Sequence, residues 1–194
     1  MNSYSRTSAK MRITGGSARG RIIKTLPGLA VRPTTDRVRE AIFSMLGSIS
    51  GDWNRGLDLF AGSGALGIEA LSREAGWIDF VDQNNKSCKI IKENLEKTGF
   101  SAKAHVYCCT VAKALGFLEE RYNLIFLDPP YADSSLGLLL TGIAGSRLIS
   151  DDSTVLVSHA SRSPLENQYS SLSKIKEKRY GDTCISIYRK EVAA

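Results

Sequence analysis

Short apolar runs alternate with amphipathic stretches from Arg55 onward, and this alternation predicts strands and helices in turn. The runs are rich in Leu, Ile, Val and Phe, which is typical of strands buried on both faces of a parallel sheet. Helices between such strands cover the two faces, so the pattern predicts an α/β protein. The predicted strands are residues 56–59, 77–81, 104–108, 124–127 and 154–158, and the predicted helices are residues 65–73, 85–98, 111–119 and 135–145.

The last part of the chain departs from this alternation. Residues 173–179 and 184–189 are predicted to be two strands joined at Gly181 and Asp182, which indicates an antiparallel hairpin and not another crossover. A doubly wound, Rossmann-like sheet that ends in such a hairpin is the outline of the AdoMet-dependent methyltransferase fold. It is not the usual layout of a dinucleotide-binding sheet.

Ahead of the sheet, the pattern predicts a small N-terminal extension. Residues 12–16 and 20–24 are expected to form two short strands around a Gly/Ser turn. A helix follows that Thr34 or Thr35 can cap, and Gly47 suits its C-terminal end. We therefore expect a disordered tail over residues 1–10, a basic extension over 11–50 and a methyltransferase domain over 51–194.

Composition narrows the class of protein. A chain of 194 residues with 42% hydrophobic content can bury one good core. Its apolar runs fall short of the roughly 20 residues of a membrane span, and residues 1–10 lack the apolar centre of a signal peptide, so we expect a cytoplasmic protein without a membrane partner. The four cysteines form no C-x-x-C pair, which predicts small core residues and neither a metal site nor a disulfide framework.

Charge is concentrated at one end of the chain. The net charge is +6, and residues 1–40 hold nine Lys and Arg against Asp36 and Glu40, so the remainder is close to neutral. A basic extension on a near-neutral body fits a polyanionic partner, and a merely solubilising tail is the alternative. The candidate RNA contacts are Arg19, Arg21, Arg32, Arg37 and Arg39.

The most informative stretch is a predicted strand, glycine turn and helix over residues 57–70. Gly62, Gly64 and Gly67 satisfy the spacing G-x-G-x-x-G, which by itself points loosely to a dinucleotide. Asp58 opens the turn, however, and a carboxylate there repels a pyrophosphate but attracts the positive amino and sulfonium groups of S-adenosyl-L-methionine (AdoMet). The turn is therefore predicted to hold AdoMet, with a purely structural capping role as the alternative for Asp58.

Further cofactor contacts are expected at neighbouring strand ends. Asp82 follows Asp58 by 24 residues, where a carboxylate can bind the hydroxyls of an adenosine ribose, and this contact does not separate AdoMet from NAD. Methyltransferases of this fold often have Asp or Asn after the third strand to bind adenine, whereas this chain has Thr110 there. The predicted cofactor contacts are Asp58, Phe60, Gly62, Gly64, Asp82 and Thr110.

The predicted strand 124–127 leads into Asp128, Pro129, Pro130 and Tyr131. Two prolines constrain the backbone and remove two N–H donors. The Asp128 carboxylate and the Pro129 carbonyl can then accept both hydrogens of an exocyclic amine, which localises the nitrogen lone pair for attack on a sulfonium methyl. Tyr131 offers a face on which the base can stack. These four residues are the predicted catalytic site.

Several stretches then carry a resemblance to one family. They are residues 12–16 (RITGG), 19–21 (RGR), 32–43 (RPTTDRVREAIF), 58–73 (DLFAGSGALGIEALSR) and 181–188 (GDTCISIY). Together they resemble the RsmD family, whose members are bacterial 16S rRNA guanine-N2 methyltransferases. The resemblance spans residues 12–189 and implies AdoMet-dependent methylation of one guanine in the small ribosomal subunit, with 128–131 as the target-amine site.

Three other functions stay open on the sequence alone. The Asp-Pro-Pro-Tyr motif also serves adenine-N6 methyltransferases on DNA or RNA. A non-catalytic assembly factor could retain the fold without the reaction, and an NAD-dependent enzyme would retain the glycine turn. The expected partner is 16S rRNA or the small subunit, and the expected oligomeric state is a monomer.

Overall fold

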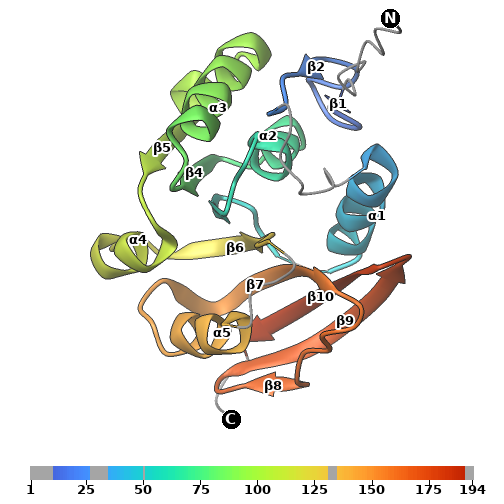
Figure 1. Ribbon diagram of the computed structural model, residues 1–194, viewed down its shortest axis with the longest axis vertical. Coiled ribbons are helices and arrows are strands. Elements are labelled where there is room, and N and C mark those ends of the chain that lie inside the picture. The colour runs from blue at the N-terminus through green and yellow to red at the C-terminus, as the bar shows by residue number, and fades with distance from the viewer. Residues whose placement is uncertain (1–10, 27–34, 50, 131–134, 191–194) are drawn as a thin grey trace, which may run out of the picture.

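The computed structural model describes residues 11–26, 35–49, 51–130 and 135–190, and its main feature is an eight-stranded sheet (Figure 1). The strand order is β5-β4-β3-β6-β7-β10-β9-β8, with β3 to β7 parallel and β10 antiparallel to both of its neighbours. The predicted doubly wound sheet with a C-terminal hairpin is therefore confirmed. The strands are β3 (Arg55–Leu59), β4 (Trp77–Asp82), β5 (Ala104–Cys108), β6 (Tyr122–Leu127), β7 (Ile149–Ala160), β8 (Gln168–Tyr169), β9 (Leu172–Tyr180) and β10 (Thr183–Lys190).

Helices cover both faces of this sheet and divide its core into two clusters. One cluster joins residues of the first three helices to the sheet, for example Ile42, Leu66 and Ile91, and the other joins Ala114 and Leu140 of the last two helices to the opposite face. Within the described residues, no helix is long and apolar enough to cross a bilayer. The helices are α1 (Asp36–Gly47), α2 (Ala65–Ser72), α3 (Asn85–Thr98), the 3-10 turn η1 (Ser101–Lys103), α4 (Val111–Phe117) and α5 (Leu136–Ala144).

In the main sheet and the helices after β3, most observed element bounds lie within two residues of the predicted ones, and two differences are larger. β7 begins at Ile149, five residues before its predicted start at Thr154, because Ile149 pairs with Tyr122 across a register shift in β6. β8 was not predicted, because its two residues are too few to show any periodicity. Strand β5 and helix α3 have the predicted bounds, and Thr35 caps α1 by accepting a hydrogen bond from the Val38 amide at 3.3 Å.

The N-terminal extension packs into the main core. Its strand pair, β1 (Met11–Arg12) and β2 (Ile22–Ile23), is shorter than predicted. Met11, Ile13 and Ile23 are nevertheless buried in the same cluster as residues of α2 and β4. Apolar side chains from both sides of residue 50 thus share one core, and the predicted tail over residues 1–10 lies outside the described residues.

Glu69 of α2 anchors the extension to the body. Its carboxylate is fully buried and accepts hydrogen bonds from the Thr14 amide (2.8 Å), the Thr14 hydroxyl (2.7 Å) and the Gly15 amide (2.8 Å). Arg73 donates a further bond at 3.0 Å, and the Arg39 guanidinium lies 3.8 Å away. A buried carboxylate is stable only when it is paired and hydrogen-bonded in this way, so the strand pair is held by a charged network as well as by apolar packing.

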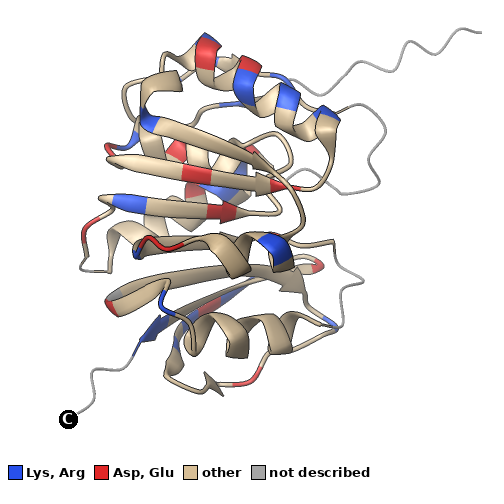
Figure 2. Cartoon of the chain, turned by 90° about the vertical axis from the view of Figure 1, so that its left-hand side faces the viewer, with Lys and Arg blue, Asp and Glu red and all other residues tan. Residues whose placement is uncertain are grey.

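The central strands β3 and β4 contain acidic residues, which lie at different positions along the strands (Figure 2). Asp79 is in the first half of β4 and is fully buried; it accepts hydrogen bonds from Arg55 (3.0 Å), the Trp77 indole (2.9 Å) and the Tyr122 hydroxyl (2.9 Å). Burial, with Asp79 beside it, raises the pKa of Tyr122 well above its usual value. Asp79 is thus accounted for by internal contacts, whereas Asp82 ends β4 at the edge where the parallel strands end.

Candidate functional site

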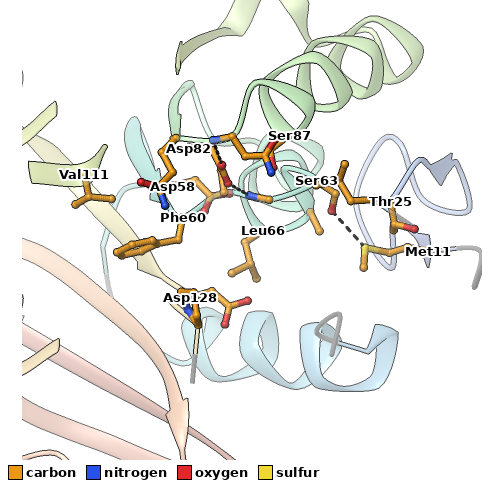
Figure 3. Close-up of a pocket in the computed structure, with 17 residues that line it drawn as sticks. Met11, Thr25, Asp58, Phe60, Ser63, Leu66, Asp82, Ser87, Val111 and Asp128 are labelled. Atoms are coloured by element: carbon orange, nitrogen blue, oxygen red, sulfur yellow. Dashed lines mark hydrogen bonds between the residues drawn. The ribbon is translucent and has the colours of Figure 1, made fainter. Parts of the chain in front are cut away.

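A cavity of about 310 Å³ opens at the carboxyl ends of the parallel strands (Figure 3). β3 lies between β4 and β6 in the sheet, so the chain crosses over in opposite directions on the two sides of β3 and leaves a crevice there. Segments after β3, β4 and β6 line it, together with residues of the N-terminal extension. Phe60 and Val111 lie at one end of the cavity, and Met11 and Thr25 lie at the other.

The turn after β3 has a backbone that requires glycine. Gly62 and Gly64 have φ values of 57° and 77°, in the left-handed region that other residues rarely adopt. Phe60 also has a positive φ, 62°, which is a strained conformation for a bulky residue and one that concentrates at functional sites. Gly67 is required for a different reason, because a Cβ there would collide with the Phe80 ring under α2. The first two glycines therefore shape the cavity, and the third allows the helix to pack on the sheet.

Asp58 lines the cavity while its carboxylate is almost completely buried, at 1% exposure. It accepts a hydrogen bond from the Gly67 amide at 2.9 Å, so it does cap the turn. Burial raises the pKa of Asp58 well above its usual value, and the nearby charges of Asp128 and Asp82 raise it further. Three carboxylates at one cavity favour a cationic ligand, which would offset their mutual repulsion, over a pyrophosphate.

Asp82 links the loops that follow β3 and β4. One carboxylate oxygen accepts a hydrogen bond from the Gly62 amide and the other from the Asn84 amide, each at 2.8 Å. An ionised carboxylate has about four acceptor positions, so two amide bonds leave capacity for the hydroxyls of a ribose. Gln83 and Ser87 extend the same wall, and sequence reasoning did not identify them because polar residues after a strand carry no distinctive spacing.

Asn94 holds the extension against the glycine turn. This buried residue of α3 accepts a hydrogen bond from the Lys24 amide (2.8 Å) and donates to the carbonyls of Lys24 (3.0 Å) and Ser63 (2.9 Å). Thr25 and Leu26, which follow Lys24 along the chain, line the cavity. Asn94 therefore fixes one wall of the cavity relative to its floor, and the only sign of this in the sequence is an amide on the apolar face of a predicted helix.

Asp128 and Pro130 bring the end of β6 to the cavity. Leu127 pairs with Leu59 in the sheet, so Asp128 follows at the level of the glycine turn. Asp128 is half-buried, and Figure 3 shows its carboxylate below Leu66. Pro129 is buried and Pro130 is exposed. Tyr131 lies outside the described residues.

Thr110 is not brought into the cavity. It is exposed, and its hydroxyl caps α4 by accepting a hydrogen bond from the Lys113 amide at 3.3 Å. The residue that lines the cavity at this position is its neighbour Val111. A hydroxyl at a helix start serves the helix first, since the amides of the first turn have no partner within the helix.

Arg39 is buried inside the protein, so its side chain is not at the surface where the predicted RNA contact would need it. Its side chain is fully buried at 0% exposure, where it donates to the Arg12 carbonyl and to Asp36 (2.8 Å) and lies 3.8 Å from Glu69. The helical spacing of α1 turns Arg39 toward the strand pair, so its charge balances Glu69 inside the protein.

The other basic candidates differ in their surroundings. Arg19, Arg21 and Arg37 are exposed, and Arg21 also donates to the Lys97 carbonyl at 3.1 Å. Arg32 lies outside the described residues. Three of the five predicted arginines are thus at the surface of the extension, which also supplies a wall of the cavity.

Comparison with known proteins gives consistent matches over nearly the whole chain. The family described as conserved hypothetical protein 95 matches residues 11–189. Ribosomal RNA small subunit methyltransferase D of Escherichia coli K12 is 31% identical over 187 residues, which cover 95% of this chain and 92% of that protein. YlbH of Bacillus subtilis 168, a candidate rRNA methyltransferase, is 40% identical over 183 residues, 93% of this chain and 99% of that one. The solved structure of yhhF from Escherichia coli, a candidate methyltransferase, superposes with a TM-score of 0.80 at 32% identity, covering 95% of this chain and 99% of that chain.

Proposed function

The chain belongs to the RsmD family, and on this premise we propose that it methylates the N2 amino group of one guanine in 16S rRNA with AdoMet as methyl donor. The chain is an AdoMet-dependent rRNA methyltransferase, because the relatives that match nearly its whole length carry the name of rRNA methyltransferases. The observation that carries the proposal is the position of Asp128 and Pro130 on the same cavity as Asp58, Asp82 and the glycine turn. A methyl donor and an acceptor amine can therefore meet in one place.

The cavity suits AdoMet by shape and by charge. The left-handed turn at Gly62 and Gly64 lets the backbone approach a ligand closely, and Asp82 has acceptor capacity for the ribose hydroxyls. The buried Asp58 carries a raised pKa that a cationic amino group or sulfonium nearby would lower again. AdoMet supplies an activated methyl group whose departure leaves a neutral thioether.

The chain's own contribution to the reaction is to place and polarise the amine. We assign the Asp128 carboxylate and the Pro129 carbonyl as the two acceptors for its hydrogens. An amino group conjugated to a purine is a poor nucleophile, and two acceptors localise its lone pair while they stabilise the positive charge that develops on nitrogen. We also propose that the target guanine flips out of its helix and that its base stacks on Tyr131.

The test of this function is the identity of the methylated nucleoside. Small ribosomal subunits from cells that lack the modification are incubated with labelled AdoMet and the full chain, digested to nucleosides and separated. We expect N2-methylguanosine at one position. N6-methyladenosine as the sole product would support the adenine-N6 alternative, and tight subunit binding without any transfer would support a non-catalytic assembly factor.

The exposed arginines of the extension are proposed to contact rRNA phosphates. Changing Arg19, Arg21 and Arg37 together to Glu should weaken binding to small subunits and reduce the slope of log K against log salt by about 2, since each single-strand phosphate contact contributes about 0.7. The measurement is a binding titration at several salt concentrations.

A matched control reverses three charges at the opposite end of the strands, Lys103, Arg121 and Arg147, all of them exposed. This control should keep the wild-type slope. If the variant at Arg19, Arg21 and Arg37 has the same slope of log K against log salt as the wild type, the extension serves only to keep the protein soluble.

We also propose the cytoplasm as the place of action, because ribosomal subunits are its substrate, and a monomer as the active form. The support for the monomer is that Asp58, Asp82 and Asp128 come from one chain and line one cavity. Light scattering of the purified protein measures its mass directly.

A further inference from the structure

Two of the four cysteines meet beside the cavity. Cys108 ends β5 and is exposed, so the expectation of a buried core residue was wrong for it. Cys88 lies in the first turn of α3, is 4% exposed, and its sulfur lies 3.3 Å from the Asp82 carbonyl oxygen. Cys108 is also the sheet partner of Asp82, the residue that links the two cavity loops. An accessible thiol and a buried thiol therefore both lie against Asp82, a proposed cofactor residue.

Both thiols take part in hydrogen bonds that support the cavity wall. Cys88 donates to the Asp82 carbonyl at 3.3 Å, and Cys108 donates to the Asn85 side-chain oxygen at 3.0 Å. Asn85 begins α3, and its neighbours Asn84 and Ser87 line the cavity. Loss of the two S–H groups would thus remove two contacts that hold the start of α3 against the ends of β4 and β5.

We propose that Cys108 is an oxidation site for a hydroperoxide and that Cys88 resolves it as an intramolecular disulfide. In the first step the Cys108 sulfur attacks hydrogen peroxide, an S–O bond forms as the O–O bond breaks, and one water leaves after proton transfer. In the second step the Cys88 sulfur attacks the sulfenic acid, an S–S bond forms as the S–O bond breaks, and a second water leaves. Two thiols lose two electrons and the peroxide gains them.

The order of the two residues follows from their surroundings. A solvent oxidant reaches Cys108 directly, whereas Cys88 is covered by the protein. Burial, with Cys108 as a neighbour, raises the pKa of Cys88 to about 12, so Cys88 stays protonated and is not the thiol that peroxide oxidises first.

The remaining cysteines are poorly placed to compete. Cys109 is the next residue after β5, and successive side chains along a strand point to opposite faces of the sheet; its side chain packs against the cluster that contains α4. Cys184 is buried on β10, separated from β5 by several strands. They provide the matched controls.

Disulfide formation should weaken cofactor binding, and this consequence rests on the proposed function. An S–S bond of about 2.05 Å pulls the start of α3 toward β5 and leaves neither sulfur with a hydrogen to donate. We expect the affinity for S-adenosylhomocysteine, an unreactive analogue, to fall about tenfold on oxidation, in line with the loss of one to two hydrogen bonds.

The experiment oxidises the full chain with a small excess of hydrogen peroxide and maps disulfides by mass spectrometry of unreduced peptides. We expect a Cys88–Cys108 link in the wild type and in Cys109→Ser and Cys184→Ser, and no such link in Cys108→Ser or Cys88→Ser. A link to Cys109, a link between two chains, or conversion of Cys108 to sulfinic acid while Cys88 stays reduced would overturn the proposal.

Calorimetry with S-adenosylhomocysteine before oxidation, after oxidation and after re-reduction tests the consequence separately. A reversible loss of affinity in the wild type that Cys108→Ser does not show supports it, and an unchanged affinity in the disulfide form contradicts it. Absence of binding by the reduced wild type would contradict the proposed cofactor while leaving the disulfide mapping intact, so the two failures are distinguishable.

Discussion

Replacing Asp128 with alanine should lower the rate of methyl transfer by two to three orders of magnitude while leaving S-adenosylhomocysteine binding nearly intact. The variant removes one of two proposed acceptors for the amine, and a single electrostatic contact that acts on the transition state is worth roughly 10² to 10³ in rate. Asp128 lines the cavity at the end of β6, whereas the glycine turn follows β3 and is held by Asp58 and Asp82, so the cofactor side should keep its geometry. Single-turnover kinetics with saturating AdoMet measures the loss.

Asp128→Asn is a second, milder variant, because the asparagine amide has the same size as the carboxylate and retains one acceptor oxygen. It should retain more activity than Asp128→Ala. Removal of the Asp128 charge should also relieve part of the upward pKa shift of Asp58, to which Asp128 contributes after burial. Full turnover by Asp128→Ala would show that the acceptor is misassigned, whatever the identity of the methylated base.

Replacing Glu69 with alanine should destabilise the protein by about 3 to 5 kcal/mol, the range seen when one partner of a buried charge network is removed. The change leaves the Thr14 and Gly15 amides without their acceptor, and it removes the carboxylate that lies 3.8 Å from the fully buried Arg39. For a chain of this size, 1 kcal/mol corresponds to roughly 2 to 4 °C, so the melting temperature should fall by about 10 °C.

Thermal unfolding followed by circular dichroism measures this change, with Glu96→Ala, an exposed carboxylate on α3, as the control that should shift little. Because the anchored strand pair carries Met11 to the cavity, Glu69→Ala should also weaken S-adenosylhomocysteine binding. A melting temperature equal to that of Glu96→Ala would mean that apolar packing alone holds the extension.

Much of the fold was predictable because its signals are local. Apolar runs and amphipathic stretches are patterns of residues that lie within a few positions of one another along the chain. The bounds of β5 and α3 were therefore predicted to the residue. The cap at Thr35 is equally local, since a hydroxyl reaches an amide three residues on. β8 was missed because two residues show no period.

Part of the site was predictable for a related reason. In an open parallel sheet the carboxyl ends of the strands lie at the same edge. Residues that follow different strands in the sequence therefore lie close together in space. Asp58, Gly62, Asp82 and Asp128 do line one cavity. Thr110 does not, because the same strand-end position is also a helix start, and its hydroxyl caps α4.

The sequence by itself therefore determined the order of the elements, the glycine turn and the residues at the strand ends, because each of these depends on contacts a few residues apart. Only the tertiary structure decided that Arg39 is a buried counter-charge and not a surface residue, that Glu69 and Asn94 hold the extension, and that Cys88 and Cys108 both lie against Asp82. Those pairings join residues far apart along the chain. Burial decides whether a charge is an internal partner or a surface contact, and no local pattern records it.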